Sequence, residues 1–447
     1  MKPRLWLITL LLGQFFLSCN KELKNDPHSA SNEDNIIKDW YGLAHSNLKI
    51  AVVSDIHYMD PSLLGKGGAS GAAFLNYLDA DPKLVEYSDP IFRKVMADVK
   101  AERPDILLIT GDITKDGEKV GHLAMARFFH QLERAGIKIF VVPGNHDINN
   151  GKAKKFIGDN AYPVDKTTKE EFASIYGDFG YNSALAKDPS SLSYVAQLQP
   201  GLRLISIDAS KYEEYGPEGD VAAGRIKPAT LSWILNQMEQ AKQKHIAVFA
   251  MMHHNLVEHY AGQSQLDPGY VIDDWQNVAN TLVDAGLKII FTGHYHANDI
   301  TPYSHNGKQL FDIQTGSLVT APSPYRFITA SATRLDITTK TVQSIEANLP
   351  GGLSFPAYSG MFLSQHLDGY FNYYLANNLG APAPLASFAA PLFRNGIMAH
   401  FAGDEKMPPD QLEKINELGS MSPQLAGIVT TLWTDLGEKD NKNIIKY

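Results

Sequence analysis

The chain has 447 residues, of which 44% are hydrophobic and 20% are charged, as is typical of a globular protein of two or three domains. It contains a single cysteine, which excludes a disulfide scaffold and a cysteine-rich metal site. Forty Lys and Arg residues against 49 Asp and Glu residues give a net charge of −9, so we expect no long nucleic acid as a partner.

The N-terminus has the pattern of an export signal. Lys2 and Arg4 precede an apolar run at residues 5–17, which is too short to span a bilayer and has the length of a signal-peptide core. We therefore expect a signal peptide at residues 1–19 and a polar tether at residues 20–47.

The end of this segment resembles a bacterial lipobox. The small residue Ser18 precedes Cys19, and Phe16 stands where such boxes usually carry leucine. We expect a lipoprotein signal peptide and lipidation of Cys19, which would anchor the protein to a membrane of the bacterial cell envelope, in the periplasm or on the surface. The alternative is an ordinary cleaved signal peptide with an incidental cysteine.

Strand and helix patterns alternate through the body of the chain, which predicts an α/β fold. Apolar runs typical of strands buried on both faces lie at residues 48–53, 106–109, 137–142, 202–207, 246–252 and 287–291, and further strands are predicted at 310–313 and 330–337. Helical patterns lie at residues 89–101, 120–135 and 229–242, and residues 168–171 have the pattern of a capping box.

The pattern changes beyond Pro350. Residues 361–379 and 409–418 have helical patterns and are separated by turns that contain glycine and proline. We therefore predict a main α/β domain at residues 48–350 and a mainly helical C-terminal domain at residues 351–447.

Five short motifs follow predicted strands. They are Asp55-Ile56-His57, Gly111-Asp112, Gly144-Asn145-His146-Asp147, His253-His254 and Gly293-His294-Tyr295-His296. Ligands of open α/β sheets bind beyond the carboxyl ends of the strands, so these motifs should meet at one edge. Asp, Asn and His offer the oxygen and imidazole ligands that suit Mn, Fe, Zn, Co or Ni. Each motif alone is weak, and the prediction of a metal site rests on all five together.

The motif series resembles the calcineurin-like metallophosphoesterase superfamily over about residues 48–340. Within it, the chain looks most like bacterial cyclic-nucleotide phosphodiesterases, some of which carry a helical C-terminal domain. The closer resemblance lies in residues 111–118, 144–147, 253–256, 316–318 and 325–326. It implies a four-layer α/β/β/α sandwich and a metal-dependent phosphoric ester hydrolase.

The resemblance also implies two metal ions, whose identity stays open among Mn, Fe, Zn, Co and Ni. By motif position, the first metal would be held by Asp55, His57 and His296. The second would be held by Asn145, His253 and His294, with His254 as the alternative to His253. Asp112 would bridge both metals.

Two metals acidify a bridging water to hydroxide and neutralise the phosphoryl oxygens, so that the hydroxide can attack in line. His146 would then give a proton to the leaving alkoxide, since imidazole titrates near working pH. Asp147 would orient His146 or cap the following turn.

Three residues are predicted substrate contacts: Lys115, His254 and Arg326. Lys115 stands where purple acid phosphatases carry a tyrosine, so we expect no tyrosinate-ligated iron. The alternative for Lys115 is an exposed, solvated side chain.

Three functions are weighed. The first is a phosphodiesterase outside the cytoplasm that acts on small diesters, including cyclic nucleotides, because the motif loops offer few cations for a monoester dianion. The second is a phosphomonoesterase on the same scaffold, and the third is a catalytically weak, lipid-anchored ligand-binding protein, against which the complete ligand set argues.

The C-terminal domain is expected to shape or cover the active-site edge without supplying ligands; alternatively its aromatic residues only pack its helices.

Overall fold

The computed structural model describes residues 47–447 except 218 and 438. The predicted signal peptide, its Cys19 and nearly all of the predicted tether lie outside the described residues. Within the described part of the chain, none of the helices has the length and apolarity that crossing a membrane requires.

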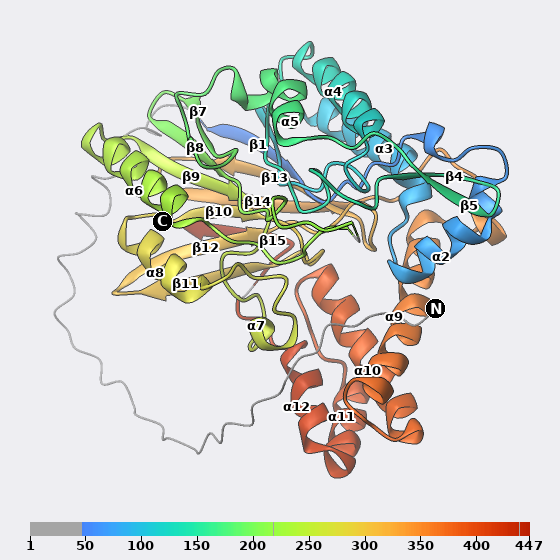
Figure 1. Ribbon diagram of the computed structural model, residues 1–447. Helices are drawn as coiled ribbons and strands as arrows, with labels where there is room; N and C mark the ends of the chain where they lie inside the picture. Colours follow the sequence, from blue (N-terminus) through green and yellow to red (C-terminus); the bar gives the residue numbers. More distant parts are fainter. Residues whose placement is uncertain (1–46, 218, 438) are drawn as a thin grey trace, which may run out of the picture.

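Two β-sheets form the centre of the molecule (Figure 1). The six-stranded sheet has the order β15-β14-β13-β1-β2-β3 and the seven-stranded sheet has the order β11-β12-β10-β9-β8-β7-β6. The strands of the first are β1 (Leu48–Val53), β2 (Ile106–Ile109), β3 (Lys138–Val141), β13 (Pro324–Ala330), β14 (Arg334–Thr341) and β15 (Lys442–Lys446). Those of the second are β6 (Ala186–Lys187), β7 (Tyr194–Gln199), β8 (Leu202–Ile207), β9 (Ala247–Met252), β10 (Ile289–Thr292), β11 (Ile300–His305) and β12 (Lys308–Gln314).

The strands that precede the motifs run parallel. β1 pairs with β2 and β2 with β3 in parallel, and in the other sheet β8, β9 and β10 are parallel neighbours. Parallel neighbours place their carboxyl ends at the same edge, so the predicted convergence of the motifs has a structural basis.

The alternation of side chains in β9 shows how the layers pack. Phe249 and Met251 join the core between the two sheets, whereas Ala250 and Met252 pack with the helices on the outer face of the seven-stranded sheet. Successive residues of a strand point to opposite faces, so both faces of this strand are covered. The predicted α/β/β/α sandwich is confirmed.

The outer helices follow the predicted patterns. Figure 1 shows α3 (Ser88–Glu102), α4 (Lys119–Glu133) and α5 (Lys169–Ile175) on one side of the sandwich and α6 (Pro228–Gln243) and α8 (Trp275–Asp284) on the other. The predicted capping box is present at the start of α5, where Thr168 and Glu171 each bond the other's backbone N–H. Further short elements of this part of the chain are α2 (Ala72–Ala80), α7 (Gln263–Leu266), β4 (Lys154–Ile157) and β5 (Asn160–Pro163).

Four C-terminal helices form a lobe with its own core (Figure 1): α9 (Phe355–Asn377), α10 (Ala383–Ala402), α11 (Pro409–Met421) and α12 (Pro423–Thr431). The predicted domain end at residue 447 needs a correction, because β15 returns from the lobe and pairs with β14 in the six-stranded sheet. The predicted strand at residues 330–337 is also wrong, since a turn after Ala330 divides it between β13 and β14.

Candidate active site

The five motifs meet at one edge of the sandwich. Asp55 and His57 follow β1, Asp112 follows β2, Asn145 and His146 follow β3, and the histidines of the last two motifs follow β9 and β10. Three groups of side chains place possible ligand atoms within 4.8 Å of one another: Asp55 with His57 and His296, His57 with Asp112 and His146, and Asp112 with His253 and His294. These groups contain six of the seven predicted metal ligands together with His146. The seventh, Asn145, joins them through a contact with His253.

Asp112 lies between the two halves of this group. Its Oδ2 is 3.5 Å from His57 Nε2 and 3.3 Å from His253 Nε2. His253 Nε2 is also 3.1 Å from Asn145 Oδ1. A carboxylate shared by both halves has the position that a bridging ligand requires.

The first half contains buried polar atoms without partners. Asp55 Oδ1 and both ring nitrogens of His57 make no hydrogen bond, although both side chains have no exposed surface. Leaving such groups unpaired is costly unless another ligand satisfies them. Metal cations would satisfy these atoms of Asp55 and His57, because carboxylate and imidazole ligands suit first-row transition metals.

Neighbouring groups hold the ligands in position. His253 Nδ1 donates to the Thr110 carbonyl at 2.8 Å, and His296 Nδ1 lies 3.0 Å from Thr320 Oγ1. Each contact leaves the Nε2 atom of that histidine directed to the carboxylates, as is usual for histidines that bind metals. Asp55 Oδ2 accepts from the His294 backbone N–H at 2.9 Å, which leaves Oδ1 free.

The backbone of the site is strained. Asp55, His57, Asp112, His294 and His296 all have positive φ angles between 42° and 75°. Residues other than glycine rarely adopt this conformation, and such strain clusters at functional sites.

Close approaches at the site require glycine. A Cβ at Gly144 would lie 2.1 Å from Asp112 Oδ1, and a Cβ at Gly293 would lie 2.6 Å from Asp55 Oδ2. The motif glycines therefore make room for the ligand carboxylates.

The protonation of the histidines suits ligation. Burial lowers the pKa of His57 well below its usual value, and burial with the charge of His253 lowers the pKa of His294 to about 3. Both rings are thus neutral, the form that binds metals. Burial also lowers the pKa of His253, but the carboxylates of Asp112 and Asp55 raise it to about 9, so a cation at this position would replace a proton.

His146 faces the site, and a neighbouring aspartate orients it. Its Nδ1 lies 2.8 Å from the Lys115 carbonyl and 3.0 Å from Asp116 Oδ1, and its ring packs edge-on against His57 with centroids 4.8 Å apart. Burial and Lys83 lower the pKa of His146, but Asp220, Asp112 and Asp116 raise it to about 9.

The predicted role of Asp147 as the group that orients His146 is wrong. The Asp147 carboxylate accepts instead from the backbone N–H groups of Gly144, Ile113 and Thr114 at 2.9–3.1 Å. It therefore ties the second and third motif loops together. Asp116 takes the orienting position, and its place inside the Gly-Asp motif segment is the signal that could have identified it.

The predicted substrate contacts at Lys115 and Arg326 are also wrong. Lys115 is fully buried, with its Nζ 2.5 Å from Asp116 Oδ2 and 2.7 Å from Glu118 Oε1, so it is neither a substrate contact nor a solvated lysine. Arg326 is fully buried and donates to the carbonyls of Gln314, Asp299 and Asp440. Both cations stabilise the interior.

His254 supports its neighbours. Its Nε2 lies 3.0 Å from the Ala222 carbonyl, its ring has no exposed surface, and its centroid is 4.4 Å from that of His294. This arrangement favours His253 over His254 as a ligand, and it corrects the prediction that His254 contacts substrate.

Two cations at the site, Lys83 and Lys152, were not predicted from the sequence. Lys83 Nζ lies 3.3 Å from His146 Nε2 and 2.9 Å from Asp81 Oδ2. Lys152 Nζ lies 2.8 Å from Asp220 Oδ1, while Asp220 Oδ2 accepts from Asn145 Nδ2 at 2.7 Å. Lys83 lies far from the motifs in sequence, whereas Lys152 is five residues beyond the end of the third motif, and no local pattern distinguishes either from a surface lysine.

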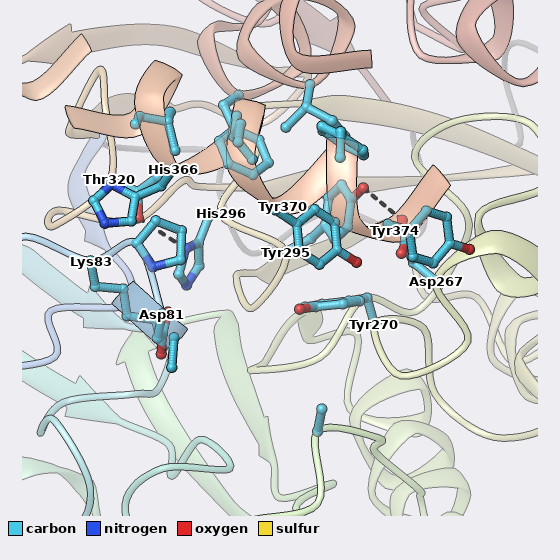
Figure 2. A pocket seen from close by; sticks show the side chains of 18 of the residues that line it. Asp81, Lys83, Asp267, Tyr270, Tyr295, His296, Thr320, His366, Tyr370 and Tyr374 are labelled. Atoms are coloured by element: carbon cyan, nitrogen blue, oxygen red, sulfur yellow. Dashed lines mark hydrogen bonds and ion pairs between the residues drawn. The ribbon is translucent and has the colours of Figure 1, made fainter. Parts of the chain in front are cut away.

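A cavity of about 1140 Å³ adjoins these residues. Figure 2 shows Asp81 and Lys83 at one end of it, and Tyr270, Tyr295 and the α9 side chains Tyr370 and Tyr374 at the other. Its lining includes Asp112, Asn145, His146, His294 and His296, together with apolar residues of α9, α10 and α12. The expectation that the C-terminal helices shape the active-site edge agrees with this lining.

Comparisons with known proteins point in the same direction. A family model described as calcineurin-like phosphoesterase matches residues 48–298. A probable cyclic nucleotide phosphodiesterase of Pseudoalteromonas sp. (strain SM9913) is 26% identical over 261 residues, which are 58% of this chain and 75% of that protein. The human serine/threonine-protein phosphatase CPPED1 is 23% identical over 178 residues, which are 39% of this chain and 46% of that protein.

Among solved structures, a dimetal phosphatase from Danio rerio aligns with a TM-score of 0.46 and 16% identity, covering 66% of this chain and 96% of its own. The family model spans more than half of the sequence and includes all five motifs. The chain therefore belongs to the calcineurin-like phosphoesterase family.

Proposed function

We propose that the protein is a metal-dependent phosphodiesterase that acts outside the cytoplasm on diesters whose alcohol is bulky and aromatic, cyclic nucleotides included. The observation that carries this proposal is the cavity, which joins the candidate metal ligands to a wall of tyrosines and apolar side chains. The relative from Pseudoalteromonas, a probable cyclic nucleotide phosphodiesterase, supports the same substrate class.

Two residue sets would hold the metals: Asp55, His57 and His296 on one side, and Asn145, His253 and His294 on the other, with Asp112 between them. Bound there, the two ions would supply an acidified water and positive charge at the phosphoryl oxygens.

The balance of charge favours a diester over a monoester. The two lysines of the cavity are each paired, Lys83 with Asp81 and Lys152 with Asp220. Asp116, at the same end, shares the single charge of Lys115 with Glu118, so this group is also net negative. A monoester dianion usually needs unpaired Arg or Lys groups, whereas a diester carries one negative charge.

The size of the cavity favours a large alcohol group. Pockets for small molecules commonly measure about 300–1,000 Å³, and this one is at the upper end or beyond. The ring of Tyr270 lies 4.8 Å from that of His294 and 4.9 Å from that of Tyr295, centroid to centroid, so an aromatic surface begins beside a metal ligand. A nucleobase or another ring could stack there.

His146 is the proton donor in this proposal. Its Nδ1 is held by Asp116 and the Lys115 carbonyl, so Nε2 faces the cavity and can pass a proton to the leaving oxygen. Lys83, 3.3 Å from Nε2, adds positive charge where that oxygen becomes negative.

A comparison of substrates tests the proposal. The metal-loaded protein is assayed on matched alkyl and aryl diesters, on cyclic nucleotides and on the corresponding monoesters. We expect higher kcat/KM on diesters, and we expect His146→Ala to lower the rate by about 10²–10⁴ on alkyl diesters and much less on aryl diesters.

The competing function is phosphomonoester hydrolysis, which Lys83 beside His146 would favour if substrate displaced Asp81. A higher kcat/KM on simple monoesters than on any diester would establish that alternative. Equal rate losses on alkyl and aryl diesters would remove the proton-donor role of His146.

We further propose that the protein is exported and lipid-anchored at Cys19 in the bacterial cell envelope. The support is the charged start, the short apolar run and the position of the single cysteine in the sequence. Cys19→Ala should abolish fatty-acid labelling and move the protein from the membrane to a soluble fraction. Labelling that persists in Cys19→Ala would contradict the anchor.

A further inference from the structure

A second group of acidic side chains lies where the C-terminal lobe meets the sandwich. Asp299 precedes β11, Glu405 lies between α10 and α11, and Asp435 and Asp440 lie between α12 and β15. We call these four residues the junction cluster. None of them is a candidate ligand of the active site.

Three of the carboxylates are close enough to share one ion. Asp299, Asp435 and Asp440 each place an oxygen within 4.8 Å of the other two. Ca²⁺ binds oxygens at about 2.3–2.6 Å, so two of its ligands are separated by at most about 5 Å. Asp299 and Asp440 are buried, whereas Asp435 is partly exposed and leaves a path for an ion to enter.

The cations beside the junction cluster are shared with other groups. Arg326 is buried beside it but donates to backbone carbonyls, including those of Asp299 and Asp440. His259 Nδ1 lies 3.4 Å from Asp299 Oδ2, and its Nε2 lies 3.4 Å from Asp312 Oδ2. The single positive charge of this ring is therefore shared between two carboxylates.

A buried atom without a partner gives a second, separate indication. The Glu405 side chain is 1% exposed and its Oε2 makes no hydrogen bond. Its Oε1 lies 2.5 Å from His400 Nδ1, an atom that is 3.9 Å from Asp299 Oδ2, so the carboxylate lies against the cluster. A buried carboxylate oxygen without a donor or cation is costly.

The acidities of two members agree with a deficit of positive charge. Burial and the charges of Asp299 and Glu405 raise the pKa of Asp435 to about 6 and that of Asp440 to about 9. Burial also raises the pKa of Asp299, but His259, His400 and Arg326 lower it below its usual value. Like charges held together raise each other's pKa, and a bound cation would reverse the effect.

We propose that the junction cluster binds a Ca²⁺ ion through Asp299, Asp435 and Asp440, with the partly unpaired Glu405 carboxylate beside them. Oxygen ligands alone select a hard cation, and the permitted separation suits Ca²⁺ better than the smaller Mg²⁺. Asp440 already accepts from the backbone N–H groups of Ile300 and Asp404, so its carboxylate is held in place before an ion binds.

The ion would join two segments that are distant in sequence, the one before β11 and the one between α12 and β15. Because α9, α10 and α12 line the active-site cavity, Ca²⁺ at this junction fixes the wall of that cavity relative to the metal ligands. It does not take part in the reaction itself.

Terbium luminescence tests the proposal, since Tb³⁺ takes Ca²⁺ sites and Trp433 is two residues from Asp435 along the chain. Full-length protein with its active site loaded with Zn²⁺ is titrated with Tb³⁺ under tryptophan excitation. We expect saturable luminescence that Ca²⁺ displaces, and a Ca²⁺-dependent rise in the unfolding temperature.

Variants separate the two metal sites. Asp435→Asn should weaken Tb³⁺ and Ca²⁺ binding at least tenfold and remove the rise in unfolding temperature. Its control, Glu417→Gln, removes an exposed carboxylate from the same lobe and should change neither. Asp55→Asn should leave the luminescence unchanged, because it affects only the active site.

Two results would overturn the proposal. One is equal Tb³⁺ and Ca²⁺ binding by Asp435→Asn and the wild type. The other is loss of the luminescence in Asp55→Asn, which would assign the ion to the active site.

Discussion

The two ends of the active-site cavity are built differently. The metal-ligand end consists of loops at strand ends, with positive φ angles at five ligands and glycines whose replacement would collide with ligand carboxylates. The helical end consists of ordinary turns of α9, α10 and α12, with aromatic and apolar side chains that face the cavity. Under the proposed function, the first end determines the chemistry and the second determines which alcohol group fits.

The largest effect is expected at the shared ligand. Asp112→Asn removes the carboxylate between His57 and His253, so both candidate metal positions lose a charged ligand. Changes in groups that merely orient ligands cost about 10–100-fold in metal affinity or activity, and this change should cost more. Elemental analysis and kcat/KM are the measurements. Two tightly held metals with full activity in this variant would contradict the bridging position.

A smaller effect is expected at the group that orients His146. Asp116→Asn should lower the rate on alkyl diesters by about 10-fold and spare aryl diesters, because proton transfer needs a correctly placed ring. Glu118→Gln is the matched control, since Glu118 also pairs with Lys115 but does not contact His146. If both variants change the ratio of the alkyl-diester rate to the aryl-diester rate equally, the effect comes from Lys115. That result would contradict the role of Asp116 in positioning His146.

The helical end should change selectivity without changing metal content. Tyr370→Ala removes a half-exposed ring that lines the cavity in Figure 2, so KM for diesters with aromatic alcohols should rise by about 10-fold, while kcat for a small dialkyl ester stays the same. Met361→Ala, on the same helix but outside the cavity lining, is the control. If KM were unchanged for every substrate, the helical end of the cavity would only pack against the sandwich and would not select substrates.

The smallest expected effect concerns the attachment of α9. Burial raises the pKa of Glu86 to about 7, and Glu86 adds to the raised pKa of Tyr358 on α9. A carboxyl whose pKa is raised by folding contributes most stability below pH 4.5, and this contribution is lost as pH rises through 7. Glu86→Gln should therefore increase the free energy of unfolding by about 1 kcal/mol at pH 8 and change it little at pH 4.5, as measured by denaturant titration. A gain of equal size at both pH values would contradict the assigned acidity.

Local patterns in the sequence predicted the strands and helices, whereas the layers and the ligands were implied by a family resemblance. Continuous apolar runs identified β1, β2, β8 and β9, because parallel strands covered on both faces need apolar side chains at every position. The five motifs were expected to meet because parallel strands deliver their carboxyl ends to one edge. The resemblance to calcineurin-like metallophosphoesterases then implied the seven ligand candidates.

Charges were predicted less well, because burial depends on the whole fold. Lys115 lies next to a motif and was assigned to substrate, yet it forms a buried ion pair with Asp116 and Glu118. Lys83 lies outside every motif, and the loop after α2 brings it to His146. A residue's neighbours in sequence do not say which face of a loop is turned inward.

The sequence by itself thus indicated the family, the candidate ligands and the helical character of the C-terminal segment. Tertiary structure alone decided that α9, α10 and α12 line the cavity, that β15 returns to the sheet, and that three distant segments form the junction cluster. The physical reason is that strand and helix patterns arise from neighbouring residues, whereas cavities and clusters of charge arise where distant segments pack together.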